Sequence, residues 1–111
     1  MEKNILVIIK SSPVTNLNYY EALRTAAGLW DHVVTVLWIG KGVYGAVDNI
    51  DRSLTDRFLI DLPELDIDLF VETKSLCSSG FSEEDLIEFV ELADSDKVLE
   101  LIGEAEVTLV Y

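Results

Sequence analysis

The chain has 111 residues, 50% of them hydrophobic, and its 21 acidic and 8 basic residues give a formal net charge of −13. This length predicts one domain over residues 1–111, because a typical domain has roughly 150 residues. The acidity argues against direct nucleic-acid binding, which requires clustered Lys and Arg side chains. The high apolar content excludes a disordered acidic chain.

The first half of the chain predicts two strands separated by a helix. Asn4–Ile9 is a β-branched apolar run typical of a strand that is buried on both faces. A helix follows Pro13, with Asn18 as the expected N-cap. A second apolar strand covers Val33–Ile39 and stops at Gly40-Lys41-Gly42. The expected inward face of the helix is Tyr20, Leu23, Ala27 and Trp30.

The middle of the chain predicts another helix and a third strand. Asp51 or Ser53 can cap a helix that ends before Pro63. A strand over Asp68–Glu72 then leads into a loop that carries Cys77. The expected buried face of this helix is Leu54, Phe58 and Leu62.

The last third predicts two more strands and a helix. Ser82 and Asp85 form a capping box for a short helix, and a strand follows over Phe89–Leu92. Asp94 or Ser95 caps the last helix, and Val107–Tyr111 is the closing strand. For the last helix we expect Val98, Leu99 and Ile102 to face inward and Gly103 to be the stop.

Strands that alternate with helices over short connections predict a three-layer α/β/α sandwich with a mostly parallel five-stranded sheet. Ligands of such sheets bind beyond the carboxyl ends of the strands. This rule selects the three loops that follow the first three strands. The candidate anion or ligand residues there are Lys10, Ser11, Ser12, Lys41 and Gly42, and the candidate catalytic residue is Cys77.

Each of these residues also has a structural interpretation. Cys77 can be a small passive side chain, lysines past strand ends aid solubility, and Gly40 and Gly42 serve a turn. His32 has no triad around it and is expected to be solvated. The chain lacks a P-loop and a Rossmann glycine fingerprint, so we expect no cofactor. A single cysteine also excludes a cysteine-rich metal site, and we expect no metal.

The distribution of charge and apolar residues favours association. Residues 1–60 carry six acids and six bases, whereas residues 61–111 carry fifteen acids and two bases. One acidic side and a surplus of apolar residues make a partner interface plausible. No apolar run is long enough for a membrane span, and the run after Lys3 is too short for a signal peptide. We therefore expect a cytoplasmic protein with no membrane partner. The apolar surplus includes Trp30, Trp38, Tyr44 and Phe81, some of which fill the core.

Several motifs together resemble the DsrE/DsrF-like family, and within it the DsrF or TusC type of subunit. They are the opening strand, Glu21-Ala22-Leu23, Gly42-Val43-Tyr44, the stretch from Leu76 to Asp85, and Val107–Tyr111. The resemblance covers nearly the whole chain. It implies small α/β subunits with flavodoxin-like layering that form homo- or hetero-oligomers with related subunits. These complexes pass persulfide sulfur between a donor and an acceptor protein, in tRNA thiolation or in sulfur oxidation.

The resemblance also implies where a relay cysteine would stand. Related DsrE or TusD subunits carry it at the end of the third strand, which in this chain falls near Glu72. DsrF and TusC types generally lack this cysteine. The preferred interpretation is therefore an accessory, non-catalytic subunit of a sulfur-relay complex. The alternatives are a sulfurtransferase or persulfide carrier that uses Cys77, with Lys10, Lys41 or Lys74 favouring its thiolate, and a small-ligand-binding module.

Overall fold

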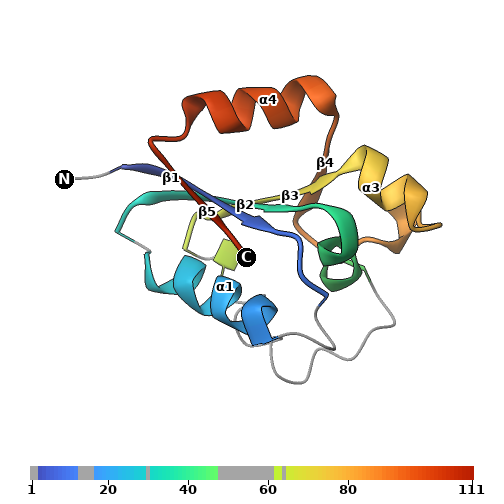
Figure 1. The fold of residues 1–111 in the computed structure, drawn as a ribbon, viewed down its shortest axis with the longest axis horizontal. Helices are drawn as coiled ribbons and strands as arrows, with labels where there is room; N and C mark the ends of the chain where they lie inside the picture. The colour runs from blue at the N-terminus through green and yellow to red at the C-terminus, as the bar shows by residue number, and fades with distance from the viewer. Residues whose placement is uncertain (1–2, 13–16, 30, 48–61, 64) are drawn as a thin grey trace.

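The computed structural model describes residues 3–12, 17–29, 31–47, 62–63 and 65–111, which fold around a five-stranded sheet (Figure 1). The strand order is β4-β3-β2-β1-β5, and each neighbouring pair is parallel. The predicted α/β class is confirmed, with a sheet that is parallel throughout. The strands are β1 (Asn4–Ile9), β2 (Val33–Trp38), β3 (Asp68–Glu72), β4 (Val90–Ala93) and β5 (Val107–Val110).

The strand order explains why helices lie on both faces of the sheet. From β1 to β4 the strands are added in one direction, and the connection from β4 then returns to place β5 beside β1. Because crossovers between parallel strands are right-handed, a reversal of direction moves the connecting helix to the opposite face. Accordingly α1 (Leu17–Gly28) covers one face and α4 (Ser95–Glu104) covers the other (Figure 1).

The larger part of the core lies between α1 and the sheet. Tyr19 and Leu23 of α1 pack there with Val36 and Trp38 of β2, all at 0–1% exposure. The Trp38 Nε1–H donates to the Tyr19 hydroxyl at 3.2 Å, so both polar atoms are satisfied inside the core. Trp38 is therefore one of the apolar residues that fill the core, and it is not available for a partner.

The predicted buried face of α1 is confirmed at Leu23 and differs at the tyrosine. The helix begins at Leu17, so Asn18 lies inside it and is not its N-cap. Tyr20 is only half-buried. The side chains that α1 buries are Tyr19, Ala22, Leu23 and Ala26. Both stripes have helical spacing, and Tyr19 is the tyrosine that faces inward because its hydroxyl meets Trp38. Trp30 lies outside the described residues.

After β2 the chain forms a 3₁₀ helix, η1 (Gly40–Gly45), that packs closely on the end of β1. A Cβ added to Gly42 would overlap the Ile9 carbonyl, so this backbone contact requires glycine. Gly40 adopts a left-handed φ of +52°, which glycine adopts without strain. Both glycines are thus required by the backbone of the turn, which is the structural interpretation given in the sequence analysis.

The segment after β3 is helical, whereas a loop was predicted. The short helix α3 (Thr73–Ser78) begins directly at the end of β3, with Glu72 as its N-cap. Its Leu76 is buried at 1% exposure, and this anchor holds the turn against η1 and the core. The predicted capping box is confirmed: the Ser82 N–H donates to Asp85 Oδ2 at 2.8 Å at the start of η2 (Glu83–Asp85).

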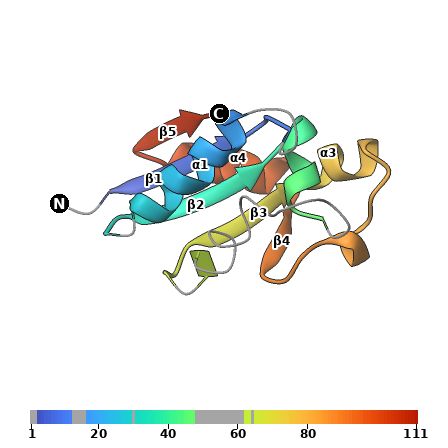
Figure 2. The ribbon, with the colours of Figure 1, turned by 90° about the horizontal axis from the view of Figure 1, so that it is seen from below.

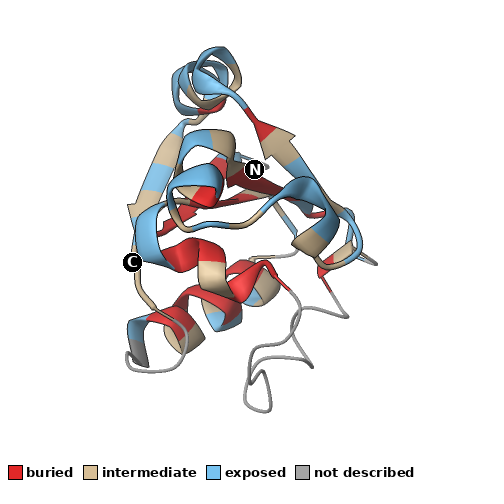
Figure 3. Ribbon diagram, turned by 90° about the vertical axis from the view of Figure 1, so that its right-hand side faces the viewer, coloured by how far each residue is buried: buried red, intermediate tan, exposed pale blue. Residues whose placement is uncertain are grey.

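The last helix is capped as predicted but oriented differently. Asp94 Oδ1 accepts the Lys97 N–H at 2.8 Å, and Leu101 is the residue that α4 buries. Leu99 and Ile102, predicted to face inward, are 68% and 44% exposed. α4 packs on the sheet as a single helix, so it buries only a narrow stripe of side chains. The apolar residues of α4 extend beyond this stripe. Figure 3 shows this helix at the top, mostly exposed or intermediate.

Two further boundaries differ from the predictions. α4 continues through Gly103 to Glu104, and β4 begins at Val90 because Phe89 has a left-handed φ of +70°. The predicted helix between Val43 and Pro63 lies mainly in residues 48–61, outside the described residues; Leu62 is buried as expected. Within the described part of the chain, no helix has the length and apolar character to cross a membrane.

Candidate functional site

The carboxyl ends of β1, β2 and β3 lie at one edge of the sheet, together with the segments that follow them. Lys10 follows β1, η1 follows β2, and α3 follows β3. Figure 2 shows η1 and α3 side by side at this end of the molecule. The topology therefore places the segments that follow the first three strands at one edge of the sheet.

A chain of two hydrogen bonds joins η1 to α3. The Gly40 N–H donates to Ser75 Oγ at 2.9 Å, and the Ser75 hydroxyl donates to Glu72 Oε1. Glu72 is half-buried at the last position of β3. Its carboxylate is thus fixed in orientation by Ser75, and Ser75 is fixed by the backbone of η1.

An open depression of about 410 Å³ lies between η1 and α3. Lys41 and Lys74 line it together with Glu72. The Tyr44 ring at its border packs edge-on against Phe81, with ring centroids 5.6 Å apart. The depression is lined by Gly40, Lys41, Tyr44, Glu72, Lys74, Ser75, Ser78 and Ser79.

Of the candidate catalytic and anion-binding residues, only Lys41 lines the depression. Lys74, which the sequence analysis named as a lysine that could favour the Cys77 thiolate, lines it as well. Gly42 is buried one residue further on, against the backbone of Ile9 and Lys10. The residues after β1 do not line the depression; the Lys10 N–H donates to the Tyr111 carbonyl at 2.8 Å and so continues the pairing with β5. Cys77, Lys10, Ser11 and Ser12 are thus not brought together with Lys41 in this cavity.

Cys77 is an exposed free thiol on α3. Its neighbours Ser78 and Lys74 line the depression, but Cys77 itself does not. The thiol therefore lies on the surface outside the cavity, on a short helix that is anchored by Leu76. Its accessibility suits reaction with a bulky partner as well as a passive role.

Ser75, Ser78 and Ser79 were missed from the sequence because the segment after β3 was predicted as a loop. Lys74, Ser75, Ser78 and Ser79 follow the helical spacing of one face. A helical prediction for Thr73–Ser78 would have placed them together, opposite the glycine-rich turn. Glu72 was noted only as the residue at the expected relay position.

The lone histidine lies at the other end of the sheet. His32 directly precedes β2, and its Nδ1 accepts the backbone N–H of Lys3 at 3.1 Å. Its Nε2 is 3.8 Å from Asp31 Oδ1. Among the described residues, no group of three or more His, Cys, Asp or Glu side chains has the arrangement to hold a metal ion.

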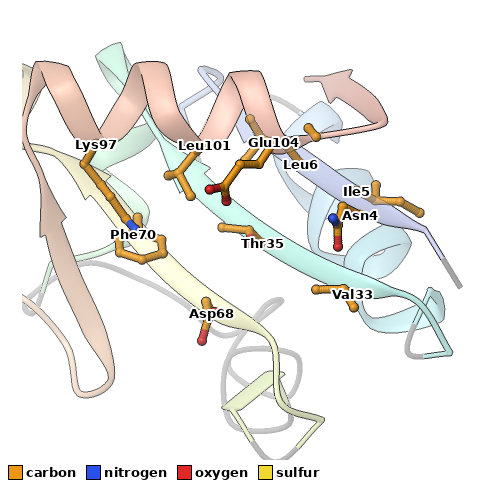
Figure 4. Close-up of a pocket in the computed structure, with 11 residues that line it drawn as sticks. Asn4, Ile5, Leu6, Val33, Thr35, Asp68, Phe70, Lys97, Leu101 and Glu104 are labelled. Carbon is orange, nitrogen blue, oxygen red and sulfur yellow. The ribbon is translucent and has the colours of Figure 1, made fainter.

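A second cavity, of about 190 Å³, lies under α4 at the amino ends of the strands (Figure 4). Lys97 is already engaged there: its Nζ is 5.3 Å from the centroid of the Phe70 ring and 3.5 Å from Glu100 Oε1. Asp68 and Thr35 extend from the exposed part of the sheet. Because ligands of parallel sheets bind at the carboxyl ends, the depression between η1 and α3 is the better candidate site.

An open parallel α/β sheet with helices on both faces and a polar site at its carboxyl edge defines the structural class. The DsrE/DsrF-like family model matches residues 3–111, and the chain belongs to this family. The fold is similar to the crystal structure of the ychN protein from E. coli, with a TM-score of 0.85 at 16% identity over 100% of both chains. It is also similar to MTH1491 of Methanobacterium thermoautotrophicum, described as a protein of unknown function, with a TM-score of 0.71 at 18% identity over 100% of both chains. No protein with a curated description matches the sequence significantly.

Proposed function

We propose that the chain is an accessory subunit, of the DsrF or TusC type, in a cytoplasmic sulfur-relay complex of the DsrE/DsrF-like family. The observation that carries this proposal is the identity and setting of Glu72. A carboxylate stands at the end of β3, where the resemblance places the relay cysteine of sulfur-carrying subunits. The carboxylate accepts a hydrogen bond from the Ser75 hydroxyl, and Glu72 stands at the N-cap position of α3, so this position has a structural role here.

An accessory subunit works through contacts with other subunits, and exposed apolar side chains support this role. Leu99 and Ile102 lie one helical turn apart on α4, and Val110 of the edge strand β5 is 54% exposed. Large exposed aliphatic side chains on neighbouring elements are typical of association surfaces. The partners that we propose are further copies of this chain or related DsrE-like subunits, with a sulfur donor or acceptor protein, and neither nucleic acid nor a membrane.

The second candidate, a persulfide carrier that uses Cys77, is favoured by the exposure of this thiol. In that reaction the thiolate attacks the outer sulfur of a donor persulfide. A bond forms between the Cys77 sulfur and the transferred sulfur, the donor S–S bond breaks, and the donor leaves as a thiolate. The exposed position on α3 provides access for a donor protein.

Intact-mass measurement after exposure to a persulfide donor separates the two candidates. We expect the wild type to gain no sulfur under conditions that load an established carrier. Prompt gain of one sulfur atom by the wild type, absent from Cys77→Ser, would establish the carrier role and refute the accessory role.

A gain-of-function variant tests the importance of Glu72 directly. Glu72→Cys in the Cys77→Ser background places a thiol at the end of β3, and we expect this variant to take up one sulfur. An accessible new thiol, shown by alkylation, that nevertheless stays unloaded would contradict the assignment of this position. Native mass spectrometry of the wild type, alone and with related subunits, measures association.

A further inference from the structure

The two lysines of the depression have no partner of opposite charge among the described residues. Of the other basic side chains in that part of the chain, two form ion pairs: Arg24 with Glu21 at 3.0 Å and Lys97 with Glu100 at 3.5 Å. Lys41 and Lys74 approach the same open cavity from different elements and form no such pair. In a molecule of net charge −13, two lysines that line one cavity and are unpaired among the described residues make a local reversal of charge.

Neutral hydrogen-bond donors stand beside the lysines. The hydroxyls of Ser78 and Ser79 line the same wall, one helical turn beyond Lys74. The Ser75 hydroxyl is not free, because it donates to Glu72 and accepts from the Gly40 N–H. Ammonium and hydroxyl donors around one cavity match the acceptor oxygens of a tetrahedral anion.

The Glu72 carboxylate is the opposing charge in the lining. With two ammonium groups it leaves the cavity with a charge of +1, since Lys41, Lys74 and Glu72 are its ionised residues. The Ser75 hydroxyl satisfies one of its oxygens and fixes it at the end of β3. Any anion in the depression is therefore attracted by both lysines and repelled by Glu72.

We propose that the depression between η1 and α3 binds a small tetrahedral oxyanion, of the sulfate, thiosulfate or phosphate type, through Lys41 and Lys74. The site differs from the anion residues selected by sequence, because Lys10, Ser11 and Ser12 do not line this cavity. It does not depend on a role of the chain in sulfur transfer.

A titration followed by backbone amide NMR tests the proposal. Sodium sulfate is added to the isotope-labelled protein, against sodium chloride at equal ionic strength, and inorganic phosphate and thiosulfate are titrated likewise. For at least one oxyanion we expect saturable shifts at Gly40, Ser78 and Ser79, with a dissociation constant on the order of millimolar because the site is open. The absence of saturation at these amides with all three anions would overturn the proposal.

Charge variants give a pattern that a structural role of the lysines would not produce. Lys41→Ala and Lys74→Ala should each weaken binding about threefold, the effect of one exposed charge contact. Glu72→Gln should strengthen binding about threefold, because it removes the repulsion and retains an acceptor for Ser75. Lys10→Ala is the matched control and should leave the affinity unchanged. Equal loss in Lys10→Ala and Lys41→Ala, or weaker binding in Glu72→Gln, would refute the site.

Discussion

Replacing Gly42 by alanine tests the closest backbone contact at the carboxyl edge of the sheet. The added methyl would overlap the carbonyl carbon and oxygen of Ile9, which are backbone atoms of a central strand. The Ile9 carbonyl already accepts the Ile39 N–H at 3.0 Å, so neither side can withdraw without losing this bond. Gly42→Ala must therefore separate η1 from β1.

The expected loss of stability in Gly42→Ala is the sum of an overpacking cost and the cost of a lost hydrogen bond. Overpacking of a dense interior costs about 1–3 kcal/mol, and a lost backbone hydrogen bond about 1 kcal/mol. We expect Gly42→Ala to lower the free energy of unfolding by about 2–4 kcal/mol, out of the roughly 5–15 kcal/mol typical of a domain. At about 4 °C per kcal/mol for a chain of this size, the midpoint of thermal unfolding should fall by roughly 8–16 °C.

Urea and thermal unfolding, followed by circular dichroism, measure this change against two matched variants. Gly103→Ala adds the same methyl in open space on α4 and should stabilise by up to about 1 kcal/mol, because alanine favours a helix. Gly40→Ala also meets no atom within 4 Å, but its left-handed φ should cost about 1–2 kcal/mol. Gly42→Ala with wild-type stability, in a series where Gly40→Ala is destabilised, would show that the contact with Ile9 does not constrain η1.

Three further predictions concern the site, α4 and the association surface. Ser75→Ala removes the bond between η1 and α3; we expect a loss of about 1–2 kcal/mol and faster hydrogen exchange at the Gly40 amide, and unchanged exchange would contradict the link. Asp94→Ala removes the N-cap of α4 and should cost about 0.5–2 kcal/mol in urea unfolding, whereas Asp94→Asn should retain most of it. Leu99→Gln should change stability by less than about 0.5 kcal/mol because the side chain is 68% exposed, yet reduce assemblies in native mass spectrometry.

The α/β fold class was predictable because the apolar composition of the strand segments is enough to indicate buried strands. β1 is apolar at five successive positions, Ile5 to Ile9, and all five are buried, as expected of a strand covered on both faces. The caps at the starts of η2 and α4 were also predictable, because the Asp85 carboxylate accepts the Ser82 N–H and the Asp94 carboxylate accepts the Lys97 N–H, each three residues away in the chain. The strand order was not predictable, because periodicity carries no information on which strands pair.

The helix faces and the site depend on tertiary contacts that local pattern does not contain. Tyr19 and Tyr20 are equally hydrophobic, and the choice between them rests on a hydrogen bond to Trp38, nineteen residues away in the chain. Lys41 and Lys74 meet only because β2 and β3 are neighbours with their carboxyl ends aligned. Leu99 and Ile102 were predicted to be buried because they are apolar. Among the described residues, however, no second helix layer covers this side of α4.

The pairing of β5 with β1 has a consequence for the biosynthesis of the chain. Of the described strands, β1 is the first in chain order, and its partner on one side, β5, is the last. Until β5 has been made, the backbone groups on that edge of β1, whose residues Ile5 to Ile9 are all apolar, lack their partner, and an open edge of this kind is a template for intermolecular pairing. Folding to the finished sheet must wait for this contact between distant segments, which slows its formation. We therefore expect nascent chains that end at β4 to be the form of the protein that is most prone to aggregate and that chaperones bind.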